Sequence, residues 1–247
     1  MPSTSEDEEQ NRTPRHRGAN SEDPRLFAEP KAQVLGEAVS DLSWLMGRGY
    51  AATSAVTIVG DRYGLHARQR MAVARASCTD ASLSKRSTSL IPADELRGQP
   101  LLIDGFNLLI TIESALSGGV ILRCRDGCYR DIASVHGSYR SVEETDRALV
   151  LIGETLNRCR PGKVTWVLDQ PVSNSGRLRT RMMECAQMNN WCWDVELAMS
   201  PDKVLMMSTD IAVTSDSTIL DNTGRWTNIA ASIIENELTD LWIVDLR

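Results

Sequence analysis

Beyond residue 100, three short apolar runs of the chain end in aspartates, which are Asp104, Asp169 and Asp216. Because the carboxyl ends of strands meet at one crevice in an open α/β sheet, we expect these three side chains to converge. Asp221 follows Asp216 by five residues and is a fourth candidate. An aspartate after a strand also starts loops and caps helices, so a structural role is the alternative for each of them.

Carboxylates brought together repel one another, and this repulsion raises their pKa values unless a cation lies among them. Their hard oxygen atoms suit Mg²⁺ or Mn²⁺. Such an ion can orient a water for attack on a phosphodiester and can neutralise the departing oxygen. We therefore expect Asp104, Asp169 and Asp216 to be catalytic metal ligands, with Asp221 in the same metal site. The chemistry that fits is hydrolysis of a nucleic-acid backbone.

The elements that must position these residues alternate between strand and helix, which is typical of an α/β fold with a mainly parallel, Rossmann-like sheet flanked by helices. Strands are expected at 101–103, 164–168, 191–197, 211–214 and 241–244. Helices are expected at 106–116, 142–158, 178–188, within 202–208 and at 228–238. The dipeptide Asp126-Gly127 is typical of a two-residue turn and predicts an inserted β-hairpin from residues 120–125 and 128–132.

The chain before residue 98 has a different composition. Residues 1–30 are polar and lack an apolar period, so we expect a disordered tail. Residues 31–90 predict a small all-helical module, and the Pro-containing, hydroxyl-rich residues 77–100 indicate a linker to the α/β domain at 98–247. The net charges are −3 for residues 1–30, +3 for residues 31–97 and −6 for the rest, which suggests different partners for the three parts.

The helical module contains an arginine-rich helix that begins near residue 67 and follows a turn, as in a helix-turn-helix. This helix can present Arg68 and Arg70, together with Arg75, to phosphates. No residue pattern for reading bases is visible, so a structural or protein-docking role is the alternative.

Length and composition exclude several classes of protein. The 247 residues are 42% hydrophobic, which is enough for a core and excludes global disorder. No apolar run approaches the roughly 20 residues of a membrane-spanning helix, and the N-terminus carries no secretory or lipidation signal. We expect a cytoplasmic protein without membrane contact, with its six cysteines reduced. Cys124 and Cys128 are the only close pair and lack the further ligands of a structural zinc site.

Three motifs carry a resemblance to known nucleases. The segments LIDGFNLL (102–109), VLDQ (167–170) and VTSDSTILD (213–221) resemble the strand motifs of PIN-like nucleases of the NYN group. The resemblance implies a PIN-like fold in which Asp104 is a metal ligand. It also implies that Asn107 lies in the turn beneath, and that the segment around Ser215 and Asp216 contributes to the same acidic pocket.

The arrangement of the whole chain is similar to an uncharacterised bacterial and archaeal family, domain of unknown function 434. The segments that carry this second resemblance are LGEAVSDL (35–42), RGY (48–50), DRY (61–63), DGCYRD (126–131) and HGSY (136–139). In that family, a short helical region precedes a PIN-like body.

PIN-like nucleases also place an acidic residue on a helix between the first and last motif aspartates. Four residues compete for this role: Glu113, Glu143, Glu144 and Glu154. Glu113 lies nine residues after Asp104, about two and a half helical turns, so it can project from the helix after the first strand and complete the metal site. A solvated helix carboxylate is the alternative.

Further polar residues are candidates for substrate binding. Arg130 at the end of the hairpin can clamp a phosphate and Asp131 can join the acidic pocket, although an internal ion pair explains both equally well. Ser173 and Ser175 form a polar loop after Asp169 that can contact phosphate through backbone amides. The other substrate-binding candidates are Asn107, Ser215, Arg68 and Arg70.

These observations predict a nuclease that depends on Mg²⁺ or Mn²⁺ and acts on a nucleic acid, with RNA favoured as the partner. The alternative is a non-catalytic nucleic-acid-binding or regulatory protein with the same fold. A phosphohydrolase with an aspartyl nucleophile is disfavoured, because position 106, where a second aspartate is needed, is Phe106. A homo-oligomer is compatible with the sequence.

Overall fold

The structure is a computed structural model that describes residues 16–133 and 139–247. The helices are α1 (Asp23–Leu26), α2 (Glu29–Gly47), α3 (Ala52–Arg62), α4 (Ala67–Ala76), α5 (Asp80–Ser89), the 3-10 helix η1 (Ala93–Glu95), α6 (Gly105–Leu116), α7 (Thr145–Cys159), α8 (Ser175–Met188), α9 (Pro201–Met207), α10 (Ser217–Asn222) and α11 (Ile229–Asn236). The strands are β1 (Leu101–Asp104), β2 (Ile121–Arg123), β3 (Tyr129–Asp131), β4 (Val164–Asp169), β5 (Trp193–Ala198), β6 (Ile211–Val213), β7 (Trp226–Thr227) and β8 (Ile243–Asp245).

A five-stranded parallel sheet in the order β5-β4-β1-β6-β7 forms the centre of the α/β part. Successive residues of β1 face opposite sides of the sheet. Leu101 and Ile103 pack with residues of α6, α7, α8 and α11, whereas Leu102 packs with residues of α9 and α10. The predicted parallel sheet flanked by helices is confirmed, and the strand order is that of a doubly wound α/β fold.

A second, three-stranded sheet in the order β3-β2-β8 lies beside the first. Its strands β2 and β3 are antiparallel, which confirms the predicted hairpin. The predicted two-residue turn is wrong, because the N–H of Cys124 donates to the carbonyl of Cys128 and the loop has three residues; of the pair Asp126-Gly127, only Gly127 has a positive φ, of 78°. The strand expected at 241–244 is observed as β8, but it does not belong to the parallel main sheet. The observed strand β8 pairs with β2 instead, with Ile243 opposite Ile121.

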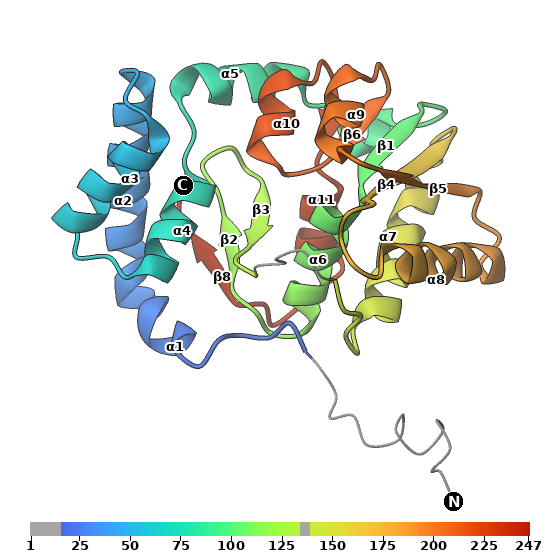
Figure 1. The fold of residues 1–247 in the computed structure, drawn as a ribbon, viewed down its shortest axis with the longest axis horizontal. Helices are drawn as coiled ribbons and strands as arrows, with labels where there is room; N and C mark the ends of the chain where they lie inside the picture. The colour runs from blue at the N-terminus through green and yellow to red at the C-terminus, as the bar shows by residue number, and fades with distance from the viewer. Residues whose placement is uncertain (1–15, 134–138) are drawn as a thin grey trace, which may run out of the picture.

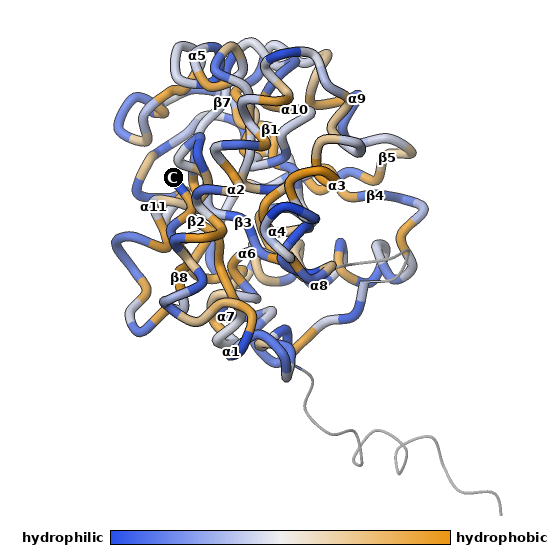
Figure 2. The backbone as a smooth tube through the Cα atoms, turned by 90° about the vertical axis from the view of Figure 1, so that its left-hand side faces the viewer, coloured by the Kyte–Doolittle hydropathy of each residue, from blue (hydrophilic) through white to orange (hydrophobic). Residues whose placement is uncertain are grey.

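The N-terminal helices pack on this second sheet and share a core with it. In Figure 1, α2, α3 and α4 lie on one side of β2, β3 and β8, and the main sheet lies on the other side. Leu35 and Leu42 of α2 belong to the same buried cluster as Leu122 of β2 and Val244 of β8. Hydrophobic stretches of the backbone, among them β2, lie inside the molecule in Figure 2. The helical part is therefore bound to the α/β part by a continuous apolar contact.

The predicted disordered tail is wrong for residues 16–30. Leu26 and Phe27 are 3% and 1% exposed and belong to the core of the helical part. Asp23 is fully buried and forms an ion pair with Arg68 of α4. Two apolar residues and one paired charge thus provide enough burial to order this segment. Residues 1–15 of the expected tail lie outside the described residues.

The predicted linker at 77–100 is wrong as well, because these residues form α5 and η1. The polar composition did not indicate that one cation, Arg86, is buried. Arg86 of α5 is 2% exposed and forms ion pairs with Asp126 of the hairpin turn and Asp221 of α10, at 2.5 and 2.8 Å. This buried charge with two carboxylate partners holds α5 against the hairpin turn and α10.

None of the helices in the part of the chain that the structure describes is long and apolar enough to cross a membrane.

Replacing Phe27 by Ala tests the order of the segment before α2. Because the ring is buried in the shared core, the substitution should lower the free energy of unfolding by about 3–5 kcal/mol. Lys31→Ala, at an exposed position of α2, should change it by less than about 0.5 kcal/mol. Chemical denaturation followed by circular dichroism measures both. Equal, small effects would show that the segment is not packed.

Candidate functional site

Asp104 lies at the carboxyl end of β1, where the order of the main sheet reverses. The chain continues from β1 to β4 on one side, and β6 pairs with β1 on the other. In doubly wound sheets, ligands bind in the crevice at this switch point. Asp104 is only 8% exposed, and the hydroxyl of Thr214, just after β6, donates a 2.8 Å hydrogen bond to its Oδ2 atom.

The electrostatic surroundings of Asp104 are acidic. Burial raises the pKa of Asp104 from 3.8 to about 7; the Thr214 hydroxyl opposes this rise, and the charges of Asp216 and Asp202 add to it. Burial and the charge of Asp202 raise the pKa of Asp169. Burial and the charge of Asp216 raise the pKa of Asp202. The largest charge effects on these three pKa values all come from other aspartates.

Four carboxylates at this end of the sheet are thus linked by electrostatic effects on one another, and we call Asp104, Asp169, Asp202 and Asp216 the acidic site. Asp169 interacts with the others through Asp202 and not with Asp104 directly. Asp202 was not predicted from the sequence, because β5 ends at Ala198 and the aspartate comes four residues later, in the first turn of α9. The available signal was Pro201, which is typical of the first helical position and places Asp202 at the start of a helix beyond a strand.

Asp216 combines a structural role with a place in the site. Its Oδ1 atom caps α10 by accepting hydrogen bonds from the backbone N–H groups of Thr218 and Ile219. Its Oδ2 atom makes no hydrogen bond with a described residue, and Asp216 also lines a cavity. Capping, the alternative to a catalytic role, therefore uses only one of its two oxygen atoms.

The loop before Asp216 is held from two directions. The backbone N–H and the hydroxyl of Ser215 both donate to Oδ1 of Asn107, at 2.8 and 3.0 Å. The Nε atom of Arg130 donates to the carbonyl of Ser215 at 2.7 Å. Asn107 and Ser215 are thus positioning residues that fix the loop between β6 and α10.

Two predicted metal ligands lie elsewhere. Asp221 forms an ion pair with Arg86, as described above. Glu113 is fully buried, with hydroxyl groups of Tyr139 and Thr145 both donating at 2.6 Å, and it forms an ion pair with Arg17. Its partners hold the described start of the chain against α6 and α7. Both carboxylates are paired with arginine, so the structure gives no support to their place in the metal site.

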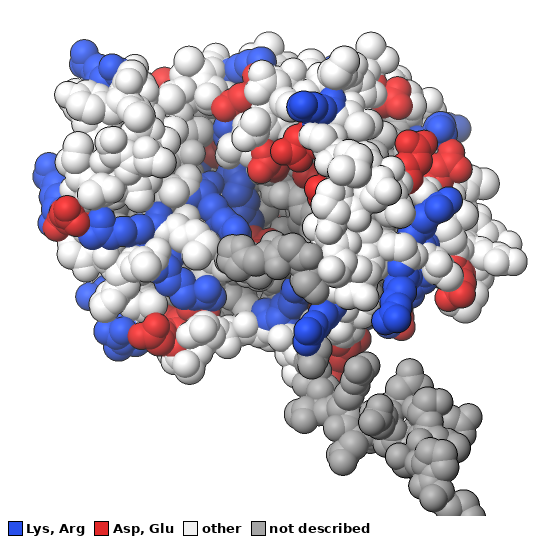
Figure 3. Space-filling view, in the orientation of Figure 1, with Lys and Arg blue, Asp and Glu red and all other residues white. Residues whose placement is uncertain are grey.

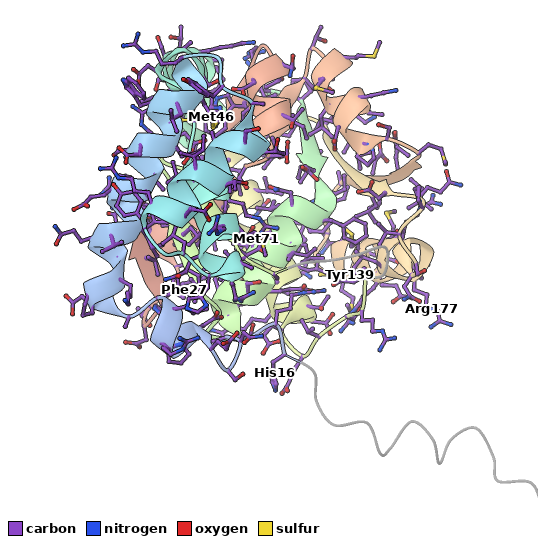
Figure 4. The ribbon with its side chains drawn as sticks, turned by 60° about the vertical axis from the view of Figure 1, so that its left-hand side comes forward. His16, Phe27, Met46, Met71, Tyr139 and Arg177 are labelled. Atoms are coloured by element: carbon purple, nitrogen blue, oxygen red, sulfur yellow. The ribbon has the colours of Figure 1, made fainter. Side chains whose placement is uncertain are left out.

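The other helix carboxylates are also outside the acidic site. Glu143 and Glu144 form ion pairs with His16, which lies where the described chain begins (Figure 4). Glu154 is exposed on α7.

Arg130 is not available as a phosphate clamp. Its Nη1 and Nη2 atoms form a bidentate ion pair with Asp126, at 3.0 and 2.6 Å, and Asp126 is also the partner of Arg86. Asp126 therefore joins two buried arginines and has a lowered pKa despite its burial, because Arg130 and Arg86 stabilise its charge. The internal ion pair, the alternative considered for Arg130, is correct.

The remaining substrate-binding candidates also have internal partners. Arg68 pairs with Asp23, and Arg70 pairs with Asp61. The hydroxyl of Ser175 donates to the carbonyls of Asp169 and Val172, which closes the turn after β4. The carbonyl of Ser173 accepts a hydrogen bond from the backbone N–H of Tyr139. These interactions stabilise the structure and leave the predicted phosphate contacts without support. His136, in the segment HGSY, lies outside the described residues.

A cavity of about 470 Å³ adjoins the acidic site. It is bounded by α4, α6, the end of β3 and the loop that carries Asp216. Figure 3 shows Lys and Arg side chains over the region of α4 and the hairpin on one side of this hollow, and Asp and Glu side chains near α10 on the opposite rim. Arg75, unlike Arg68 and Arg70, lines the cavity.

The acidic site offers hard oxygen atoms, but no three His, Cys, Asp or Glu side chains of the described residues are grouped to hold a metal ion by themselves. Mg²⁺ keeps several water ligands and is usually bound by one or two carboxylates together with substrate phosphates. Asp104 and Asp216 therefore fit this ion, whereas a site made of protein ligands alone does not.

Two family models match parts of the chain. Residues 93–232 match the model of "Domain of unknown function (DUF5616)", and residues 34–88 match that of "Protein of unknown function (DUF434)". The uncharacterized protein MJ0935 of Methanocaldococcus jannaschii is 30% identical over 203 residues, which are 81% of this chain and 97% of that protein. No solved structure matches the chain. The resemblance to the DUF434 family is thus confirmed.

The raised pKa of Asp104 predicts a pH dependence of stability. Between the unfolded value near 3.8 and the folded value of about 7, folding requires Asp104 to take up a proton. The wild type should therefore lose up to about 1.4 kcal/mol of stability per pH unit relative to Asp104→Asn in this range, and the difference should level off above pH 7. Urea unfolding of both proteins from pH 5 to 8 measures the effect. Parallel stability curves would contradict the burial of an ionisable Asp104.

Proposed function

We propose that this protein is a divalent-metal-dependent nuclease with a PIN-like α/β body. The chain belongs to the family of the domain of unknown function DUF5616. The proposed substrate is RNA, which the resemblance of the strand motifs to PIN-like nucleases of the NYN group favours.

One observation carries this proposal. Asp104 is buried at the switch point of the sheet, and the nearby charges that shift its pKa, those of Asp216 and Asp202, are both negative. A folded protein avoids such an arrangement unless the carboxyl stays protonated or a cation joins it. A hydrated Mg²⁺ or Mn²⁺ supplies this cation, and substrate phosphates complete its ligands.

The residues have distinct roles in this proposal. Asp104 and Asp216 hold the ion, while the hydroxyl of Thr214 fixes the orientation of the Asp104 carboxylate. Asp202 and Asp169 extend the acidic site along the carboxyl ends of β5 and β4. The ion, when bound, polarises the phosphodiester and a water molecule and neutralises charge on the departing oxygen. Asn107 and Arg130 keep the loop with Asp216 in place.

A non-catalytic nucleic-acid-binding protein is the second candidate. It is favoured by the absence, among the described residues, of three side chains grouped to hold a metal ion. Binding of RNA that weakens with salt, without product in Mn²⁺, would support this second candidate, because phosphate contacts release counterions.

Replacing Asp104 by Asn tests the first candidate. The variant keeps the size of the side chain but loses the charge, so cleavage of a 5′-labelled single-stranded RNA in Mn²⁺ should fall by about 100-fold or more. RNA binding measured without divalent ions should remain within about threefold, because the side chain of Asp104 itself offers no contact to a phosphate. Glu154→Gln, at an exposed carboxylate of α7, is the matched control and should cleave normally. Undiminished cleavage by Asp104→Asn, or no Mn²⁺-dependent cleavage by the wild type, would overturn the proposal.

A comparison of Asp202 with Asp221 separates the acidic site from the sequence-based ligand set. Asp202→Asn should lower cleavage by on the order of tenfold, because Asp202 acts on its neighbours through its charge. Asp221→Asn should cleave at the wild-type rate at 20 °C but have a lower melting temperature, because it weakens the ion pair with buried Arg86. Cleavage assays and thermal melts measure both effects. The reverse pattern would place Asp221, and not Asp202, in the site.

A further inference from the structure

The cavity beside the acidic site has one wall that the proposed chemistry does not use. This wall is α4, which belongs to the N-terminal helical part and not to the α/β body. We infer that the cavity binds one unstacked nucleobase of the cleaved strand, so that the helical part completes the substrate site. This inference rests on the proposed function for the position of the scissile phosphate.

The two long walls of the cavity are apolar. Met71 and Ala74 of α4 line one side, and Phe106 and Ile110 of α6 line the other. Figure 4 shows Met71 on α4, beside α6. The volume of about 470 Å³ lies within the usual range for small-molecule sites. Two apolar walls suit a planar ring, because both faces of a base are apolar and stack well on such surfaces.

Polar groups lie at the end of the cavity that faces the sheet. Asn107 lines the cavity, and its Oδ1 atom is occupied by Ser215 while its Nδ2 atom donates to no described residue. The amide N–H groups of Asn107 can therefore donate to the oxygen or nitrogen acceptors on the edge of a base. Asp131, also at the cavity, has a raised pKa because it is buried, and accepts hydrogen bonds from Thr111 and Ala133.

The cavity is continuous with the acidic site, because Asp216 belongs to both. A base held between α4 and α6 would place its own phosphate close to Asp216. Arg75 lines the same cavity with a side chain that is 35% exposed. It donates to the backbone carbonyls of Asp131 and Ala133, and its nearest carboxylate oxygen, on Asp131, is 3.5 Å away. Its charge is therefore only partly compensated and can attract the phosphate that follows the base.

A pocket for one unstacked base distinguishes single-stranded from double-stranded RNA. A base can enter the cavity only after it leaves its stack, and in a duplex this step costs a few kcal/mol. A flexible single strand meets little of this cost. The pocket therefore favours single-stranded over double-stranded RNA, and this preference depends on α4.

Two tryptophan substitutions on α4 test the inference. Ala74→Trp fills the cavity from an exposed position, and Ala67→Trp adds the same ring at an exposed position of α4 that does not line the cavity. Both are made in the Asp104→Asn protein, so that RNA is bound but not cleaved. Fluorescence anisotropy with a 5′-fluorescein 12-nucleotide RNA, single-stranded or annealed to its complement, gives the affinities, and circular dichroism checks that each variant is folded.

We expect Ala74→Trp to weaken single-strand binding about tenfold or more and to bring it close to the duplex affinity. Ala67→Trp should stay within twofold of the parent. Equal effects of the two substitutions, equal affinity of the parent for single strand and duplex, or no measurable binding would each overturn the inference. Mn²⁺-dependent cleavage by the wild type is measured separately. If Ala74→Trp cleaves RNA normally in the wild-type background, the base-binding pocket is wrong and the proposed nuclease activity stands. If Ala74→Trp weakens RNA binding but the wild type cleaves no RNA, the pocket stands and the nuclease activity is wrong.

Discussion

The burial of the Asp104 carboxyl at the end of β1 is the constraint on which the candidate site depends. Three neighbouring strands bring acidic groups to the same edge of the sheet. There the hydroxyl of Thr214 donates a hydrogen bond to Asp104, and the charges of Asp216 and Asp202 raise the pKa of Asp104. Each further carboxylate makes ionisation of Asp104 harder. This uncompensated negative charge gives the crevice its affinity for a cation in our account.

Other buried carboxylates of the molecule, such as Asp126 and Glu113, are paired with arginines. Asp126 is paired with both Arg86 and Arg130, and this network connects α5, the hairpin turn and the loop after β6. Glu113 is likewise neutralised by Arg17. Since leaving a buried charge without a partner is strongly destabilising, paired carboxylates hold elements together. The unpaired Asp104 is an exception, and such exceptions are candidates for functional sites.

The parallel strands and two residues of the acidic site could be predicted from the sequence, because they depend on local patterns. Apolar runs located the parallel strands, and the aspartates that follow β1 and β6 identified Asp104 and Asp216. Long-range pairing could not be predicted. The burial of Arg86 depends on Asp126 and Asp221, which are 40 and 135 positions away, and the ion pair of Glu113 depends on Arg17, which is 96 positions away. The order of the segment at Phe27 likewise depends on a core shared with β2 and β8. Arg68 and Arg70 were assigned to phosphates because a sequence shows an arginine but not the carboxylate that neutralises it.

The central claim concerns one ionisable group, and its titration tests that claim most directly. The carboxyl carbon of Asp104 can be followed by ¹³C NMR as a function of pH, with Asp104→Asn used to assign the signal. Our account predicts a midpoint near pH 7 without divalent ions and a midpoint at least two pH units lower in saturating Mg²⁺, because the cation stabilises the charged form. A midpoint near 4, or one that Mg²⁺ leaves unchanged, would contradict it.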